Sequence, residues 1–263
     1  MSIVKGLILI VFFIMLYKIN LLKKENIEQK DFFIRTLSHD FRVATIAQLR
    51  GLEILNKISQ FDSRQMELLT EINNSCLYSL DMISMLQNTY DFEYGKQFLK
   101  LDFFRLQNVF DNVLKKTNQS LQEKNISLRF ENISYQNIIG DESMVHKLIL
   151  LLLLTAIDYS EANSIILMSS NLENEKWKFS LTYSGKTLTD EEIGRMFSLK
   201  TYYSTVGHGI KMHLCKKIVD FHKGRIYVKK VSKNINSFTF EIPQKEKREI
   251  WKSPLIADIQ LGS

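Results

Sequence analysis

The chain is poor in residues that interrupt or cross-link structure. It contains only two prolines, Pro243 and Pro254, and both lie near the C-terminus. Proline breaks a helix because it lacks a backbone donor and clashes with the preceding turn. Nothing of this kind interrupts the N-terminal third of the chain, so the sequence predicts long helices there.

Cysteine is equally scarce, with only Cys76 and Cys215 present. Two cysteines exclude a disulfide-rich scaffold, and neither has partners at the spacing of a metal site. Both fall in amphipathic helical patterns, so we interpret them as small buried apolar residues in a reducing compartment. His208, His213 and His222 also lack metal-ligand spacing and are interpreted as loop or helix-surface residues.

An uninterrupted apolar run from Gly6 to Tyr17 lies close to the N-terminus. A spanning helix needs about 20 residues, and the flanking Lys5 and Lys18 can extend the run by snorkelling. We therefore expect residues 1–24 to form an uncleaved, single-pass transmembrane anchor. A buried core helix is the alternative interpretation.

The charge of the chain agrees with a membrane rather than nucleic acid as its partner. The formal net charge is +6, and lysines flank and follow the apolar run, at positions 5, 18, 23, 24 and 30. Such a cluster suits an anionic membrane surface. Positive charge after the run predicts that the soluble domains lie in the cytoplasm, at the inner or cytoplasmic membrane.

Residues 25–94 carry two helical stripes and are predicted to form a helical dimerisation domain. Apolar or small residues recur with coiled-coil-like spacing at 34, 37, 41, 44, 52 and 55. After a break at 60–63, a second stripe uses Met66, Leu69, Cys76, Leu80 and Ile83, with Asn73 in the seam. An antiparallel hairpin is the simplest arrangement. Because a lone hairpin buries little, we expect a homodimeric four-helix bundle.

The pattern changes to mixed helix and strand after Tyr94 and Gly95, which marks a domain boundary. Strands are predicted at 99–104, 126–131, 164–171, 176–183, 225–231 and 237–242, and helices at 105–123, 142–159 and 209–222. Residues 95–244 should therefore form an α/β two-layer sandwich, with the apolar run Leu148–Leu154 buried under the sheet. The whole chain is expected to be of the α+β class. The tail, residues 245–263, has no assigned role.

LeuSerHisAspPheArg at 37–42 is the first motif that carries chemistry. At about 100° per residue, His39 projects away from the apolar seam, where phosphate could reach an imidazole nitrogen. Asp40 could accept the ring proton, and Arg42 could steer an anionic phosphate. By itself, a His-Asp pair on a helix is equally compatible with an ordinary solvated face.

In their order along the chain, these features resemble the sensor histidine kinases of two-component systems. The resemblance covers about residues 26–242. Family members commonly read Ser-His-Glu-Leu-Arg-Thr-Pro-Leu where this chain reads SerHisAspPheArgValAlaThr, residues 38–45. The resemblance implies that His39 is the phospho-acceptor and Asp40 the adjacent base. It also implies ATP and Mg²⁺ as cofactors and a response regulator as partner.

The C-terminal domain resembles the ATP-binding fold shared by these kinases, gyrase B and the Hsp90 chaperones. ValGlyHisGlyIle at 206–210 precedes a helix where the family reads Gly-x-Gly-Leu-Gly-Leu. Gly207 and Gly209 would let the backbone approach the triphosphate, and the helix start would supply amide donors. Gly185 has the same character within TyrSerGlyLysThrLeu at 183–188, the counterpart of Asp-x-Gly-x-Gly-Ile.

Other positions depart from the family pattern. The motif Asn-Leu-Leu-x-Asn-Ala-Ile-Lys-Tyr-Ser corresponds to LeuLeuLeuLeuThrAlaIleAspTyrSer at 151–160. Leu151 and Thr155 therefore replace both asparagines, the second of which is the family's magnesium ligand. Tyr183 stands where a carboxylate accepts a hydrogen bond from adenine, and Thr187 replaces a glycine. Losing a hydrogen bond to a charged acceptor costs about 1.5–3 kcal/mol, so we expect strongly reduced ATP affinity.

Three functions are compatible with this sequence. The first is an enzyme that phosphorylates His39 from ATP and passes the phosphoryl group to a response regulator in a phosphorelay. The second is a pseudokinase or membrane scaffold, a homodimer or a heterodimer with another kinase, that receives phosphate in trans. The third is a helical membrane adaptor in which His39 and Asp40 are incidental. The expected nucleotide-binding residues are Gly185, Gly207, Gly209, Thr155 and Tyr183.

Overall fold

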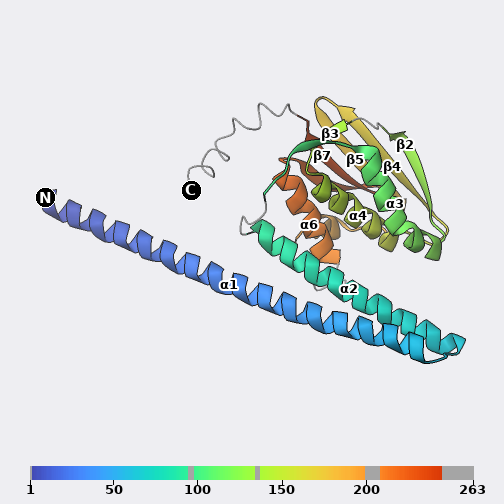
Figure 1. Ribbon diagram of the computed structural model, residues 1–263. Coiled ribbons are helices and arrows are strands. Elements are labelled where there is room, and N and C mark those ends of the chain that lie inside the picture. The colour runs from blue at the N-terminus through green and yellow to red at the C-terminus, as the bar shows by residue number, and fades with distance from the viewer. Residues whose placement is uncertain (1, 94–97, 134–136, 199–207, 245–263) are drawn as a thin grey trace. The chain divides into compact units, whose positions relative to one another are not determined.

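The computed structural model describes residues 2–93, 98–133, 137–198 and 208–244 (Figure 1). The chain divides into two units, residues 1–96 and 97–263. Gly207 and the tail from residue 245 lie outside the described residues.

The first unit is a hairpin of two long helices, α1 (Ser2–Ile58) and α2 (Ser63–Glu93). The break that the sequence predicted at 60–63 lies between them, and a capping box defines the start of α2. The Asp62 carboxylate accepts a hydrogen bond from the Gln65 N–H (2.8 Å), and the Gln65 side chain accepts one from the Asp62 N–H (3.1 Å). Reciprocal bonds of this kind satisfy two donors that a helix start leaves unpaired.

The face of α1 that packs on α2 is offset from the predicted stripe. Ser38 and Thr45 are buried, and the Arg42 guanidinium reaches across to Gln87 (3.1 Å). Phe41 and Leu55, which were predicted to lie in the seam, are instead 58% and 44% exposed. Two small hydroxyl residues therefore take buried positions on α1, whereas Phe41 and Leu55 lie on its exposed surface. In the single chain, Phe41 and Leu55 therefore lie outside the contact between α1 and α2.

No helix among the described residues is long and apolar enough to cross a membrane. The transmembrane anchor predicted at residues 1–24 is therefore not supported. From Ser2 onward these residues belong to α1, which continues without interruption into the charged segment that follows.

The second unit is built on a five-stranded sheet with the order β2-β4-β5-β7-β6. Its strands are β2 (Ser127–Ile133), β4 (Ile165–Glu173), β5 (Lys176–Ser184), β6 (Arg225–Ser232) and β7 (Ile235–Pro243). Only β2 and β4 pair in parallel, and the other neighbours are antiparallel. Helices α3 (Leu106–Glu123), α4 (Glu142–Tyr159) and α6 (His208–Phe221) lie on one face of this sheet (Figure 1). The predicted α+β class and sheet-based domain are confirmed.

Three short elements complete the second unit. Strand β1 (Asp102–Arg105) pairs antiparallel with β3 (Asn137–Gly140) in a separate two-stranded sheet. Helix α5 (Asp190–Arg195) begins with a capping box between Thr189 and Glu192. The sequence pattern predicted neither β3 nor α5, because segments of four to six residues carry too little periodicity.

The core lies between α4 and an aromatic cluster on the inner face of β5 and β7. Phe240 stacks on Phe179 with ring centroids 5.1 Å apart and meets the Trp177 ring edge-on at 4.9 Å. Leu148 and Leu152 of α4 have no exposed surface. The apolar run of this helix is thus buried under the sheet, as predicted.

Both cysteines are free and buried, as predicted. Burial raises the pKa of the Cys215 thiol well above its usual range. His222, in contrast, was wrongly interpreted as a surface residue. It is buried, with Nε2 accepting from the Asp141 N–H (3.0 Å) and Nδ1 donating to the Ile218 carbonyl (2.8 Å). Burial also lowers the pKa of His222 and keeps it neutral for these two roles.

We predict that Phe240→Ala lowers the free energy of unfolding of the second unit by about 3–5 kcal/mol, the usual cost of removing a buried ring. Phe240 is fully buried. Phe103 is largely exposed, so Phe103→Ala is the matched control and should change stability by no more than about 0.5 kcal/mol. Urea unfolding followed by circular dichroism measures both. Equal effects of the two substitutions would contradict this description of the core.

Candidate functional site

His39 lies near the middle of the hairpin on the outer surface of α1. Its side chain is 75% exposed, and Nδ1 lies 3.2 Å from Oδ1 of Asp40. This contact suits the tautomer in which Nδ1–H donates to the carboxylate, which leaves the Nε2 lone pair as the nucleophile. The structure therefore brings the two predicted catalytic residues together in an exposed position.

The surroundings of His39 are fixed by contacts within the hairpin. The Thr45 hydroxyl donates to the Phe41 carbonyl (2.8 Å). Arg42, expected to steer phosphate, donates to the Gln87 side chain instead. The local role of Arg42 in this conformation is therefore to join α1 to α2.

Thr155 and Leu151 lie on the buried face of α4. Thr155 has no exposed surface, and its hydroxyl donates to the Leu151 carbonyl one turn earlier (2.7 Å). A hydroxyl engaged in this way is satisfied within its own helix. Thr155 therefore does not present an oxygen to a ligand.

Tyr183 lies at the end of β5 and is 1% exposed. Its ring is 5.2 Å from that of Phe238 and 6.4 Å from that of Tyr159. Its hydroxyl and the Oδ1 of Asn236, its register partner on β7, have no hydrogen-bond partner among the described residues. Burial raises the pKa of Tyr183 well above its usual value, so the group is a neutral phenol. The ring thus extends the aromatic core into the position where the family carries a carboxylate.

Gly185 allows the end of β5 to touch the end of α4. Its backbone forms an isolated antiparallel bridge with Ser160, and its N–H donates to the Asn234 carbonyl (2.8 Å). A Cβ at this position would lie 2.0 Å from the Tyr159 carbonyl oxygen. Only glycine permits so close an approach. The packing of this junction alone therefore requires a glycine at position 185.

Sequence reasoning missed two residues of this region, Asp158 in the last turn of α4 and Lys211 in the first turn of α6. Gly209 is buried at the start of α6, and the ammonium of Lys211 in the same turn lies 3.4 Å from the Asp158 carboxylate of α4. In the family motifs quoted above, position 158 is a lysine and position 211 is a glycine. The replacement of lysine by Asp158 in one motif and of glycine by Lys211 in the other was the signal that could have identified them.

The end of α4 is held in place by a lysine cap. The Lys124 ammonium donates to the carbonyls of Ile157 and Asp158 (both 2.8 Å) and to that of Ser160 (3.3 Å). The last carbonyls of a helix lack intrahelical donors, and a cation there also opposes the helix dipole. Lys124 thus holds the backbone of Asp158 in place at the end of α4.

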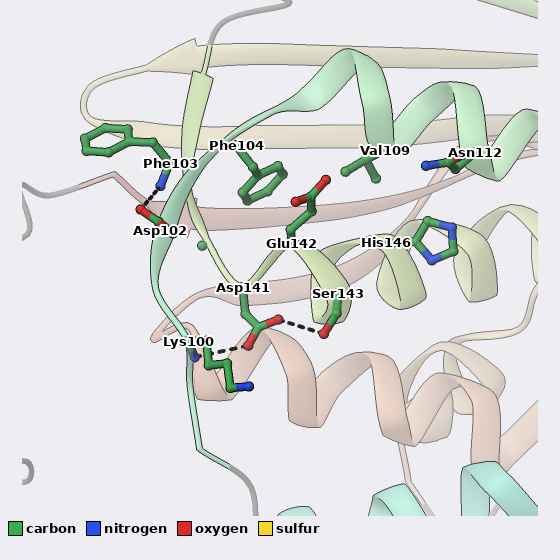
Figure 2. Close-up of a pocket in the computed structure, with 11 residues that line it drawn as sticks. Lys100, Asp102, Phe103, Phe104, Val109, Asn112, Asp141, Glu142, Ser143 and His146 are labelled. Carbon is green, nitrogen blue, oxygen red and sulfur yellow. Dashed lines mark hydrogen bonds between the residues drawn. The ribbon is translucent and has the colours of Figure 1, made fainter.

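An open pocket of about 580 Å³ lies at the opposite end of α4. Figure 2 shows Asp141 at its base, bonded to the Lys100 N–H and the Ser143 hydroxyl. The Asp141 carboxylate also caps α4 through the Met144 N–H (3.1 Å). This pocket contains none of the predicted site residues, and its Asp141 carboxylate caps the start of α4.

Comparison with known proteins defines the class of the second unit. Residues 140–246 match the model of the histidine kinase-, DNA gyrase B- and HSP90-like ATPase family. These residues include α4, β5 and α6, the elements that carry the predicted nucleotide-binding positions.

Similarity to curated proteins extends into the hairpin. The adaptive-response sensory kinase SasA of Microcystis aeruginosa is 26% identical over 240 residues, covering 84% of this chain and 62% of the relative. The circadian input-output histidine kinase CikA of Synechococcus elongatus is 21% identical, covering 81% and 30%. The chain thus spans less than two thirds of the length of these relatives. The matches confirm the resemblance to sensor histidine kinases.

Solved structures show the same fold. Full-length ShkA in complex with AMPPNP superposes with a TM-score of 0.67 at 19% identity, covering 80% of this chain and 45% of that one. The histidine kinase ThkA in complex with the response regulator protein TrrA gives 0.57 at 22% identity, covering 80% and 60%. At these identities the likeness concerns the fold alone.

We predict that Tyr183→Phe raises the free energy of unfolding by about 1 kcal/mol, because an unsatisfied buried hydroxyl costs about 1–3 kcal/mol. The ring contacts with Phe238 and Tyr159 remain in the variant. A loss of stability in urea unfolding would show that the hydroxyl is bonded in the folded chain.

The same variant changes the response to alkaline pH. The unfolded tyrosine ionises near pH 10, whereas burial keeps the folded one protonated to higher pH. The contribution of Tyr183 is therefore fully present below about pH 10 and is lost as pH rises above it. Stability of the wild type should fall more steeply above pH 10 than that of Tyr183→Phe.

Proposed function

We propose that this chain is a sensor histidine kinase of a two-component system that binds ATP and phosphorylates His39. The observation that carries this proposal is the exposed His39–Asp40 pair on a helical hairpin that precedes a unit of the ATPase family. The curated sensory kinases and the kinase–regulator complex among the solved structures support the same function.

The proposed reaction uses the observed geometry of His39. Nε2 attacks the γ-phosphorus of ATP, a bond to phosphorus forms, and ADP leaves with the electrons of the broken bond. Asp40 holds the Nδ1 proton and stabilises the positive charge that develops on the ring. The phosphoryl group then moves to an aspartate of a response regulator, the proposed partner.

Homodimerisation is part of this proposal. Large apolar side chains of the hairpin face away from the α1–α2 seam and are exposed in the single chain, among them Phe41, Ile54, Leu55, Leu68 and Ile72. Such a face supports pairing with a second copy into a four-helix bundle. Attachment of residues 1–24 to the cytoplasmic membrane stays a prediction from the sequence.

The direct test incubates the purified full chain with labelled ATP and Mg²⁺. We predict acid-labile, base-stable label on the wild type, because phosphoimidazole has this stability profile, and no label on His39→Ala. His146→Ala is the control, since His146 lies outside the phospho-acceptor motif, and it should retain label. Label on His39→Ala, or none on the wild type, would contradict ATP-dependent phosphorylation of His39.

Dimer formation is tested by placing charge on the exposed apolar face. We predict that the double variant Ile54→Glu and Ile72→Glu sediments as a monomer at concentrations where the wild type is a dimer. Val231→Glu on β6 is the control, since Val231 is equally exposed but lies in the second unit. A dimeric double variant, or a monomeric wild type, would refute the four-helix bundle.

A further inference from the structure

Thr155, at the position of the family's magnesium ligand, does not suit that role in this chain. Its hydroxyl is buried and donates to the Leu151 carbonyl. Magnesium in nucleotide sites is held by one or two carboxylates together with the phosphates, because it demands hard oxygen ligands in near-octahedral geometry. The Thr155 hydroxyl is uncharged and is directed at its own helix. It therefore supplies neither a negative charge nor an oxygen that faces the metal.

Asp158 supplies the negative charge and the accessible oxygen that Thr155 lacks. It lies three residues after Thr155, so the two positions are neighbours on one side of α4. Unlike Thr155, its side chain is 40% exposed. A carboxylate in the last turn of a helix is electrostatically unfavourable, because the dipole is negative there. Its presence therefore calls for nearby cations.

One such cation is Lys211. Its side chain is only 9% exposed, and its ammonium lies 3.4 Å from the Asp158 carboxylate. Lysine is almost never buried to this extent unless it is paired. Lys211 also lies two residues after Gly209, in the first turn of α6, where backbone amides and the positive end of the dipole favour phosphate.

The pair differs in charge from the same two positions of the family motifs. Those motifs place lysine on the first helix and glycine on the second, whereas this chain places Asp158 on α4 and Lys211 on α6. Asp158 adds a hard oxygen ligand next to position 155, where threonine stands in place of the family's ligand. Lys211 keeps one lysine ammonium between the two helices.

We propose that Asp158 is the protein ligand of the nucleotide-bound Mg²⁺ in this chain, and that Lys211 contacts the nucleotide phosphates once Mg²⁺ has taken its place on Asp158. The proposal rests on the proposed binding of ATP. Without nucleotide, Asp158 and Lys211 neutralise each other. With Mg²⁺ and ATP, the carboxylate faces the metal and the ammonium faces the phosphates, so both charges stay paired.

Calorimetric titration of the full chain with ATP, in Mg²⁺ and in EDTA, tests the first half of the proposal. Wild-type affinity should fall by about tenfold or more in EDTA, as expected for loss of a charged contact. Asp158→Ala should bind equally weakly in both. Asp220→Ala is the matched control, because Asp220 is also an exposed carboxylate paired with a lysine, Lys216, and it should behave as the wild type does.

Lys211→Met tests the second half. It should lower the affinity for ATP in Mg²⁺ by about tenfold and leave the affinity for adenosine, which has no phosphate, unchanged. A purely structural ion pair would weaken both ligands alike. If Asp158→Ala alters folding as judged by circular dichroism, Asp158→Leu replaces it, because leucine has a similar size and favours helix but offers no oxygen to the metal.

The failures are distinguishable. Mg²⁺-dependent ATP binding that persists unchanged in the Asp158 variant overturns this proposal and leaves the proposed function intact. The absence of any ATP binding by the wild type in Mg²⁺ overturns both.

Discussion

Burial of α4 against the aromatic strands is the constraint on which the second unit depends. Leu148 and Leu152 of α4 and Phe179 and Phe240 of the sheet have no exposed surface. Both ends of the helix are then fixed by polar contacts: Asp141 caps the start and Lys124 binds the last carbonyls. Because α4 is held in this way, the residues in its last turn have defined positions relative to β5 and α6.

The same burial explains why the nucleotide site departs from its family pattern. Thr155 and Tyr183 stand at positions where the family uses polar ligands, and here both belong to the core. Tyr183 enlarges the aromatic cluster, and Thr155 closes its hydrogen bond within α4. In the proposal made above, the charged groups of the site are instead Asp158 and Lys211, which pair across α4 and α6. On the inner face of α4, packing thus occupies the positions that the family uses for ligand binding.

Most regular elements could be predicted from sequence because their signals are local. The helical pattern of α4 covers 18 residues, more than a usual strand, and in β5 buried residues alternate with exposed or half-buried ones over its whole length. The offset of the hairpin seam could not be predicted in the same way. Phe41 and Ser38 lie on adjacent faces of α1, and the choice between them is made by the partner helix.

In the candidate site, too, local contacts could be predicted from sequence and contacts between distant segments could not. His39 and Asp40 are neighbours in sequence, so their contact follows from one helix. Burial of His222 depends on Asp141, far away in the chain, and the pairing of Lys211 with Asp158 depends on two helices meeting. Contacts between distant parts of the chain leave no periodic pattern in the sequence. The pairing of Lys211 with Asp158 is indicated only by the way in which both residues depart from the family motifs.

The central claim is that the second unit binds nucleotide between α4, the end of β5 and the start of α6. Hydrogen exchange of the full chain, with and without ATP and Mg²⁺, tests it most directly because it reports the contacted backbone. We predict slower exchange at residues 155–160, 183–188 and 209–213 when nucleotide is present. Unchanged exchange in these three segments, or protection confined to the pocket around Asp141, would contradict it.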